Sequence, residues 1–485
     1  MPPRKARFLM ALGVFSLSLA VRALYAADLA PVMYTREQPG IRMAMRYDAS
    51  ALRMLQGDGI LFPAEADPSK TGLLARPPGY AFFLRMVYAG LGRSFFTAQL
   101  VQNLLSSTTP VLLFLLAARL LGTAAGAIGG FLAAVSPHLG AVSNLISPDG
   151  LSALPLMAAM LVLAPVAPDR EPSLGRAAAA GVLIGLSAWL RPNLVLMGPF
   201  LAMALLVLAR TPRHAARPLA LMGAAALFAI APITLRNYAI FGEFVPISTN
   251  GGLTLWQGVA DAGGERFGAR TTDRRVAREE AVRYGKPSYA SWWAEPDGIW
   301  RDRDRYRRSL EVIRWRPLWY LRAMLRRVGE MVSYHSTGAP LVGAAAEAAE
   351  ADAEHESGDE DRLAPLRTFH ASDDAAPEPV LDDRLVLTPG EALAFTRPAL
   401  RSVQRLGGLT TLPLLLLGLA RLLRRDGRLL LWLAVVPAYY FVFESMFLYE
   451  WRVATPMHYP LFAFAGLGWA SLATAAARAI RRRAL

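Results

Sequence analysis

A carboxylate and two arginines stand close together early in the chain, in Arg46-Tyr47-Asp48 and in Arg76-Pro77-Pro78-Gly79-Tyr80. A carboxylate can take the proton of a hydroxyl or amine acceptor during group transfer. The planar guanidinium of arginine binds phosphate through two parallel hydrogen bonds and stays charged at any working pH. Arginines can also stabilise the charge that builds on a leaving phosphate. This stretch therefore predicts one wall of a site that transfers a group from a phosphate-linked donor.

Further carboxylates, amides and arginines recur at the ends of apolar segments later in the chain. They are Asn144, Asp149, Arg191, Asn193, Arg236, Asn237, Glu444, Glu450 and Arg452. Ionisable residues at membrane level are costly and are functional candidates, although each one alone could also extend to the lipid headgroups. Asp149 and Glu450 are interpreted as partners of the arginines, and the whole set favours one shared site.

Residue content excludes or disfavours several kinds of chemistry. The chain has no cysteine, which excludes disulfides, thiolate metal ligands and thiol redox chemistry. Its six histidines form no cluster, so a zinc site is not expected, and neither another metal nor a cofactor is predicted. The sequence also lacks a glycine-rich phosphate loop.

Long apolar blocks must position these residues. The chain of 485 residues is 54% hydrophobic and only 19% charged, whereas soluble domains carry nearer a quarter charged residues. Because a helix needs about 20 apolar residues to cross a bilayer, we predict an all-α polytopic membrane protein with about ten transmembrane helices. They cover roughly 8–27, 95–118, 123–143, 149–166, 176–190, 193–209, 218–235, 405–422, 428–446 and 453–476. The first block is longer than the apolar core of a signal peptide, so we interpret it as an uncleaved helix.

The arginines of the short connections predict the orientation. Connections on one side carry many, including Arg119, Arg213 and Arg424, whereas those on the other side carry Arg191 alone, Arg452 alone or none. The positive-inside rule therefore predicts that both termini are cytoplasmic. Arginine at helix ends and near lipid headgroups also accounts for the net charge of +14, so nucleic acid is not an expected partner.

Two long segments are then predicted to lie outside the membrane. Residues 28–94 form a first external loop, whose apolar end at 78–91 fits a helix lying in the membrane interface. Residues 236–404 form a larger, mixed segment with a strand-like run at 244–252. Its basic, aromatic helix at 300–334 is interpreted as an amphipathic helix on anionic headgroups. An acidic insert at 344–383 follows and is predicted to be mobile. The sequence thus predicts five parts of the chain, namely 1–27, 28–94, 95–235, 236–404 and 405–485.

The first-loop residues resemble a known family. Tyr47-Asp48, Ala51, Leu55 and Gly57, followed by Arg76-Pro77-Pro78-Gly79-Tyr80, resemble the first external loop of the GT-C membrane glycosyltransferases. The branch is glycosyltransferase family 39, with the protein-mannosyltransferases and the aminoarabinose-transferase-like enzymes. Further matches follow in family order and are Asn144–Gly150, Leu190-Arg191-Pro192, Arg236-Asn237, Ser248–Gly252 and Glu450 with Arg452. The resemblance covers most of the chain apart from about 340–400.

The resemblance implies an enzyme that transfers a sugar, with inversion, from a polyprenyl-phosphate-linked donor to a lipid, glycan or protein acceptor. It implies action on the external face of the bacterial cytoplasmic (inner) membrane, with membrane lipids as further partners, and Asp48 as the catalytic base. The residues expected to bind substrate are Tyr47, Arg76, Tyr80, Asp149, Arg191, Arg236, Asn237, Asn250, Glu450 and Arg452. Many members place the first-loop acid before the tyrosine, but here residues 41–45 contain none. Glu37 and Asp149 therefore stay alternatives to Asp48.

Two other classes of function stay open at this point. A transporter or flippase of a lipid-linked or anionic substrate would also need polar residues within a membrane, but such proteins usually show repeated halves and ionisable residues near the membrane centre. The predicted spans are almost free of charge at their centres and no repeat is visible. A ligase or polymerase of surface glycans is the other alternative.

Overall fold

The computed structural model describes residues 4–29, 41–59, 71–164, 173–208, 212–333 and 391–483. Within these ranges the chain is helical or irregular, and its extended pairing is limited to one isolated bridge between Trp292 and Glu295. Glu37 and the acidic insert at 344–383 lie outside the described residues. The prediction of an all-α membrane protein is confirmed.

Six helical segments of the described chain are long and apolar enough to cross a membrane. They are formed by α1 (Arg4–Leu29), α4 with α5 (Phe95–Ser106 and Thr108–Leu120), α11 (Pro212–Phe241), α17 (Glu391–Arg425), α18 (Gly427–Val442) and α19 (Thr455–Arg483). Four shorter apolar helices lie between them, namely α6 (Thr123–Val135), α8 (Asp149–Leu163), α9 (Leu174–Leu190) and α10 (Met197–Leu208), the last preceded by η2 (Pro192–Leu196). Each of the predicted spans therefore corresponds to one of these segments.

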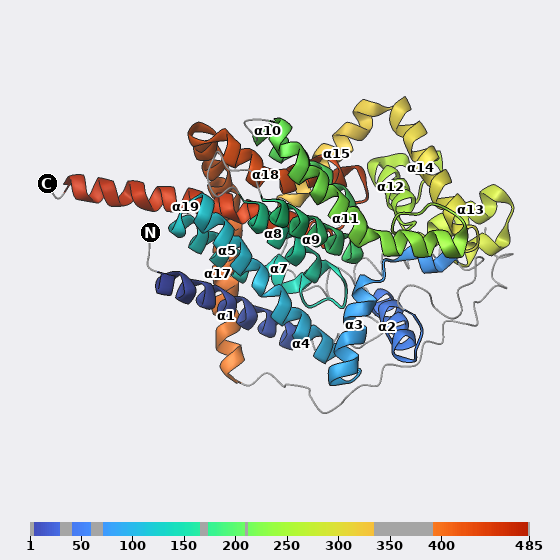
Figure 1. Cartoon of the computed structure of the whole chain (residues 1–485), viewed down its shortest axis with the longest axis horizontal. Helices are drawn as coiled ribbons and strands as arrows, with labels where there is room; N and C mark the ends of the chain where they lie inside the picture. The colour runs from blue at the N-terminus through green and yellow to red at the C-terminus, as the bar shows by residue number, and fades with distance from the viewer. Residues whose placement is uncertain are drawn as a thin grey trace.

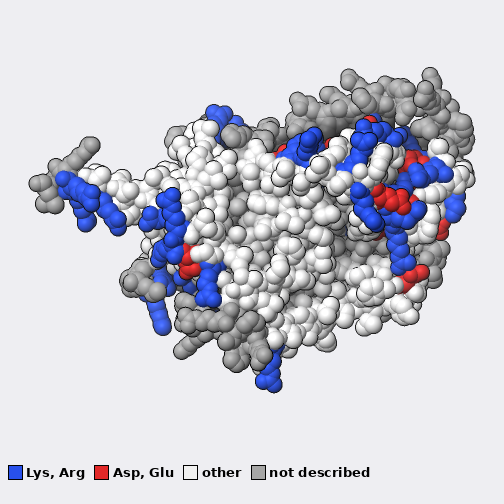
Figure 2. Space-filling view, turned by 90° about the horizontal axis from the view of Figure 1, so that it is seen from above, with Lys and Arg blue, Asp and Glu red and all other residues white. Residues whose placement is uncertain are grey.

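Small residues let the apolar helices approach closely, as is usual where lipid replaces water around them. Gly418 of α17 lies against the Phe464 carbonyl of α19, and Gly468 of α19 lies against the Leu414 carbonyl of α17. A Cβ atom at either glycine would overlap that backbone. Figure 2 shows Lys and Arg gathered toward the two ends of the face in view, with an uncharged zone between them, as expected of a bundle surrounded by lipid.

A compact helical unit lies at one end of the bundle, and both termini lie at the other end (Figure 1). The unit consists of α12 (Gly251–Val259), α13 (Asp273–Tyr284), α14 (Gly298–Trp315) and α15 (Pro317–Met331), with short helical turns η3 (Ala260–Gly264), η4 (Glu265–Phe267) and η5 (Pro287–Ala290). Its own core includes Trp256, Trp293 and Tyr320, all buried. We call it the α12–α15 unit.

The predicted strand at 244–252 is wrong, and the described part of the 236–404 segment is helical or irregular rather than mixed. Val245 and Ile247 are buried as a strand pattern would require. However, the Asn237 side chain donates hydrogen bonds to both of their carbonyls, at 2.8 and 3.1 Å. The Asn237 amide thus supplies the hydrogen-bond donors that a neighbouring strand would otherwise supply. The next helix, α12, begins at Gly251.

The predicted amphipathic helix at 300–334 is also corrected. Arg316-Pro317 divides it into α14 and α15, because proline lacks the N–H that a continuous helix needs. Its arginines do not all face headgroups, since Arg301, Arg305 and Arg308 are buried and bind the carboxylate of Glu280 in α13. Buried charges need such partners, so α14 is fixed to α13.

The first loop forms α2 (Ile41–Leu55), η1 (Thr71–Ala75) and α3 (Gly79–Leu91). The helix predicted at 78–91 is present as α3, and its place in the membrane interface stays a prediction. Gly79 lies so close to the Trp189 carbonyl at the end of α9 that a Cβ atom would overlap it. The Arg76-Pro77-Pro78 turn is thereby held next to Arg191.

Candidate active site

A cavity of about 490 Å³ lies where the first loop, the end of α9 and the α12–α15 unit meet. We call it the large cavity. Six of the residues predicted to bind substrate line it, namely Tyr47, Arg76, Arg191, Asn250, Glu450 and Arg452. They come from segments that are far apart in the sequence, so the topology brings this part of the predicted set together.

Two arginines of the large cavity are held by carboxylates. Arg191 pairs with Asp149, which is fully buried behind the lining and also accepts a hydrogen bond from the Ser147 hydroxyl at 2.9 Å. Arg452 Nε donates to Glu450 Oε2 at 2.7 Å and lies 4.0 Å from Asp149 Oδ2. The predicted pairing of Asp149 and Glu450 with arginines therefore describes their geometry, and these pairs fix the guanidinium groups at the cavity.

The first loop contributes Arg76 and Tyr47 to the same cavity. The Arg76 guanidinium lies 5.2 Å from the centre of the Tyr47 ring, within the range of a cation–π contact. The Tyr47 ring in turn packs edge-on against Tyr80 at 5.0 Å between centroids. This stack orients Arg76 without pairing its charge with a carboxylate.

Several buried polar atoms of the large cavity have no hydrogen-bond partner in the described part of the chain. They are Arg191 Nε, Asn193 Oδ1 and Asn250 Oδ1. Buried polar groups in folded proteins nearly always have a partner, and leaving one unpaired costs about 1–3 kcal/mol. One donor and two acceptors thus remain for a polar ligand.

The α12–α15 unit contributes two acids, Asp273 and Asp302, that the sequence analysis did not single out. Asp273 begins α13, where Thr272 caps the helix, and Asp273 Oδ1 accepts a hydrogen bond from Gln257 Nε2 at 2.9 Å. Burial raises the pKa of Asp273 above its usual range, and Glu450 adds to the rise. Asp302 Oδ1 accepts from the Leu253 N–H at 3.2 Å, and burial raises the pKa of Asp302 to about 7.

Asp48, the predicted base, does not line the large cavity. It is 1% exposed and faces α3, where the Tyr88 hydroxyl donates to Asp48 Oδ1 at 2.9 Å. Arg93 donates to both carboxylate oxygens, at 3.2 and 2.7 Å. These contacts use both oxygens to join α2 to α3 and to the turn after it. The role of Asp48 as base stays a prediction that this placement does not favour.

Tyr80, Arg236 and Asn237 lie outside the large cavity as well. Tyr80 is fully buried, and its hydroxyl donates to Gln102 Oε1 at 2.7 Å. Asn237 supports the 245–247 segment, as described above. Arg236 lines a second, smaller cavity, which Arg76 and Pro77 also line.

The sequence offers little that could have revealed Asp273 and Asp302. Both stand among arginines in a charged stretch without a recognisable spacing. The one local sign is the Thr272-Asp273 pair, which is typical of a helix start. Among the described residues, no three histidine or acidic side chains lie together so that they could hold a metal ion.

Comparison with known proteins gives a family match over part of the chain. Residues 75–235, about a third of the chain, match the family model for dolichyl-phosphate-mannose-protein mannosyltransferase. No curated protein matches the sequence. The chain is similar to the crystal structure of ArnT from Cupriavidus metallidurans bound to undecaprenyl phosphate, with 15% identity, a TM-score of 0.36, and 96% of this chain and 76% of that chain covered. The apo state of the same protein gives 17% identity, a TM-score of 0.36, and coverages of 94% and 77%. The family match begins directly before the Arg76-Pro77-Pro78 turn and ends within α11.

Proposed function

We propose that the protein transfers a sugar, with inversion, from a polyprenyl-phosphate-linked donor to an acceptor on the external face of the bacterial inner membrane. One observation carries the proposal: Arg191 Nε, Asn193 Oδ1 and Asn250 Oδ1 are buried at a single cavity without protein partners among the described residues. A guanidinium donor suits a phosphate oxygen, and amide acceptors suit sugar hydroxyls. The matched family model is named for a dolichyl-phosphate-linked sugar, which is a donor of this class.

The reaction we propose is a single displacement. The acceptor oxygen or nitrogen forms a bond to the anomeric carbon while the bond from that carbon to the phosphate oxygen breaks, and polyprenyl phosphate leaves. Arg76, Arg191 and Arg452 would stabilise the charge on the leaving phosphate. A carboxylate would take the proton of the acceptor.

Asp273 is the acid of the large cavity that best fits the role of base. Glu450 is held by Arg452, and Asp302 accepts from the backbone of α12. Asp273 binds only the neutral amide of Gln257 in the described part of the chain, and it lies near Arg76 and Glu450. A raised pKa also makes its carboxylate more basic, as proton removal requires.

The test is transfer of labelled sugar from a panel of polyprenyl-phosphate sugars by the purified protein in lipid nanodiscs. Asp273→Asn should lower kcat by at least about a hundredfold, while Asn250→Ala should weaken kcat/KM by about tenfold. Arg314→Gln, on the exposed surface of α14, is the matched control and should retain full activity.

Two other results of these measurements would support the alternatives to this proposal. If Asp273→Asn is fully active and Asp48→Asn is inactive at unchanged stability, the base is Asp48 as the sequence predicts. If the protein moves these lipids between leaflets of a vesicle but transfers no sugar from any of them, the transferase proposal fails and the transporter alternative replaces it.

A further inference from the structure

Gln102 of α4 does not line the large cavity, but it connects two of the walls that do. Its side chain is fully buried, in a helical segment long and apolar enough to cross a membrane. Gln102 Oε1 accepts a hydrogen bond from the Tyr80 hydroxyl at 2.7 Å. Gln102 Nε2 donates to the Ser143 carbonyl at 2.8 Å and to the Leu145 carbonyl at 2.7 Å. One amide thus connects the first loop to the segment between α7 (Pro137–Val142) and α8.

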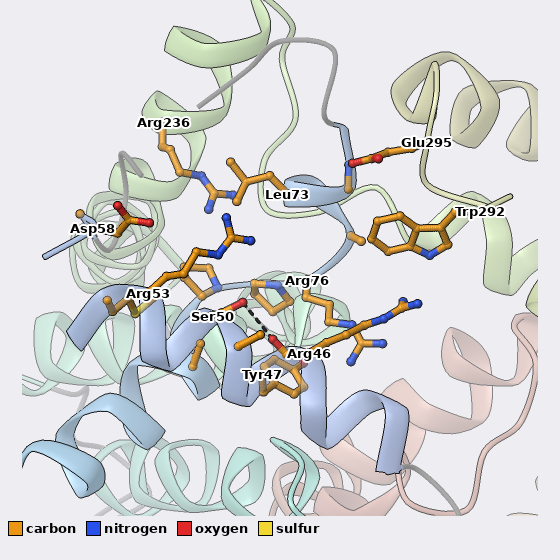
Figure 3. A pocket seen from close by; sticks show the side chains of 18 residues that line it. Arg46, Tyr47, Ser50, Arg53, Asp58, Leu73, Arg76, Arg236, Trp292 and Glu295 are labelled. Carbon is orange, nitrogen blue, oxygen red and sulfur yellow. Dashed lines mark hydrogen bonds between the residues drawn. The ribbon is translucent and has the colours of Figure 1, made fainter. Parts of the chain in front are cut away.

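The first connection leads to Arg76. The Tyr80 ring packs edge-on against Tyr47 at 5.0 Å between centroids, and the Arg76 guanidinium lies 5.2 Å from the centre of the Tyr47 ring (Figure 3). The contact of Gly79 with α9 fixes the backbone at the start of α3, but it does not fix the direction of the Tyr80 side chain. The hydrogen bond to Gln102 holds the Tyr80 ring, on which Tyr47 and then Arg76 pack.

The second connection leads to Arg191. The segment 143–148 carries the carbonyls that Gln102 binds, and α8 begins directly after it with Asp149. Asp149 pairs with Arg191 and also accepts a hydrogen bond from the Ser147 hydroxyl. Carbonyls outside a helix need donors when they are buried among apolar helices, and Gln102 binds two of them. Gln102 therefore holds the segment from which Asp149 fixes Arg191.

Other side chains on the same face of α4 also bind this part of the chain. Together with Gln102 they follow the i, i+3, i+4, i+7 spacing of one helix face, and they are Gln99, Asn103 and Ser106. The Ser106 hydroxyl, for example, donates to the Gly150 carbonyl at 2.9 Å. Gln102 additionally accepts the hydrogen bond from the first loop, so at Gln102 the position of one wall depends on the position of the other.

This dependence matters because Arg76 and Arg191 carry like charges and both line the large cavity. Burial lowers the pKa of Arg76, and the charge of Arg191 acts in the same direction. The two guanidinium groups are therefore near enough to repel each other, and they would move apart if the walls that carry them were not held. Two arginines at a fixed separation can bind different oxygens of one phosphate.

We propose that Gln102 is a positioning residue, which sets the separation of Arg76 and Arg191 so that both bind the same phosphate group. The proposal rests on the proposed function, because polyprenyl phosphate supplies that phosphate. Gln102 itself contacts no substrate. It acts on Arg76 through the two tyrosine rings, and on Arg191 through the segment that ends at Asp149.

The test measures the affinity of purified protein in phosphatidylcholine nanodiscs for polyprenyl phosphate, per folded molecule. Gln102→Met keeps the length of the side chain and removes its three hydrogen bonds, so it should weaken binding by about tenfold. When Arg76→Gln or Arg191→Gln is already present, the same substitution should weaken binding by less than about threefold. The reason is that the separation of two charges no longer matters once one of them is absent.

Ser106→Ala is the matched control, because it removes a buried hydrogen bond from the same face of α4. It should lower the thermal unfolding midpoint and leave the affinity per folded molecule unchanged. Tyr80→Phe removes only the hydroxyl that Gln102 accepts from, so it should also weaken binding, and it replaces Gln102→Met if that variant does not fold. The proposal is overturned if both variants bind like the wild type. It is also overturned if Gln102→Met costs the same factor with and without Arg76, since an additive loss indicates a general structural role.

Sugar transfer by the same preparations separates this inference from the proposed function. Transfer by the wild type, together with unchanged affinity in Gln102→Met and Tyr80→Phe, overturns the positioning role and leaves the proposed function in place. The coupled losses of affinity in a protein that transfers no sugar support the positioning role and contradict the proposed function. A wild type that binds no polyprenyl phosphate overturns both.

Discussion

Asp302 shows how one buried carboxyl group can make the stability of the protein depend on pH. It is 6% exposed, and burial raises its pKa to about 7, compared with about 3.9 in an unfolded chain. Between these values the folded state binds more protons than the unfolded state. The free energy of unfolding therefore falls as the pH rises from about 4 to 7, and this effect levels off above pH 7.

Asp302→Asn should remove this dependence. The variant keeps the oxygen that accepts from the Leu253 N–H and loses the buried charge, so its unfolding midpoint should exceed that of the wild type by about 2–5 °C at pH 8. Near pH 4 the two midpoints should agree. The measurement is thermal unfolding across this pH range, and an equal difference at every pH would contradict the assignment. Glu311→Gln, an exposed neighbour on α14, serves as the control.

The contacts of Asp48 predict a variant that loses stability more than activity. Asp48→Asn removes the ion pair with Arg93 and weakens the bond from the Tyr88 hydroxyl, which together should cost about 1.5–3 kcal/mol of unfolding free energy. Folded protein should keep most of its kcat. The two quantities are separated by measuring transfer per folded molecule together with the unfolding midpoint, and an inactive but fully stable variant would support the catalytic role instead.

Several arginines of the large cavity could be predicted from the sequence, but two of its acids, Asp273 and Asp302, could not. The set of Arg191, Glu450 and Arg452 could be found because arginine is rare in the short connections on the predicted external side and therefore stands out there. Asp273 and Asp302 could not, since they are charged residues in a charged stretch, and only packing shows that they are buried. The orientation of Asp48 was equally inaccessible, because the partner Arg93 is 45 residues away in sequence.

At the scale of elements, the α12–α15 unit depends on one carboxylate. Glu280 of α13 is fully buried and accepts from Arg301, Arg305 and Arg308 of α14, at 2.7, 2.6 and 3.0 Å. Since Asp273 lies at the start of α13 and Asp302 on α14, this cluster also sets the separation of the two acids that reach the large cavity. The fixed geometry of these helices is therefore a condition for the site.

Glu280→Gln should destabilise this unit strongly. It removes the negative charge that three buried guanidinium groups share. Removal of one partner of a buried ion pair typically costs about 3–5 kcal/mol. Glu311→Gln removes an exposed partner of Arg307 and should change stability by less than about 0.5 kcal/mol. Limited proteolysis between α12 and α15, together with thermal unfolding, measures the effect. Equal behaviour of the two variants would refute a structural role for the cluster.

The helices themselves were predictable to the extent that apolar length determines them. All ten predicted spans correspond to apolar helical segments, since a run of apolar residues in lipid can satisfy its backbone only as a helix. The strand predicted at 244–252 is absent, because an alternating apolar pattern does not specify the backbone partner of a segment. Alternating apolar residues such as Val245 and Ile247 show that a segment is half-buried. They do not show what binds its backbone, and here the Asn237 side chain rather than another strand donates hydrogen bonds to the carbonyls of both residues.

At the scale of the whole molecule, the positions of the basic clusters and the topology both distinguish two opposite ends of the helical bundle. The termini lie at one end and the α12–α15 unit with both cavities near the other (Figure 1). The first helix begins with Arg4, Lys5 and Arg7, and the last helix ends with Arg481, Arg482 and Arg483. The positive-inside rule predicts that both clusters are cytoplasmic. A polyprenyl-phosphate sugar would then reach the large cavity from the outer leaflet.

This orientation can be tested cleanly because the chain has no cysteine of its own. We expect a membrane-impermeant maleimide to label Ser288→Cys, on the exposed η5 turn of the α12–α15 unit, in intact spheroplasts. Lys5→Cys and Arg482→Cys, at the exposed ends of α1 and α19, should react only after permeabilisation, because the bilayer would separate them from the reagent. The reverse pattern would place both cavities on the cytoplasmic side, and transfer on the external face would then be impossible whatever chemistry the large cavity supports.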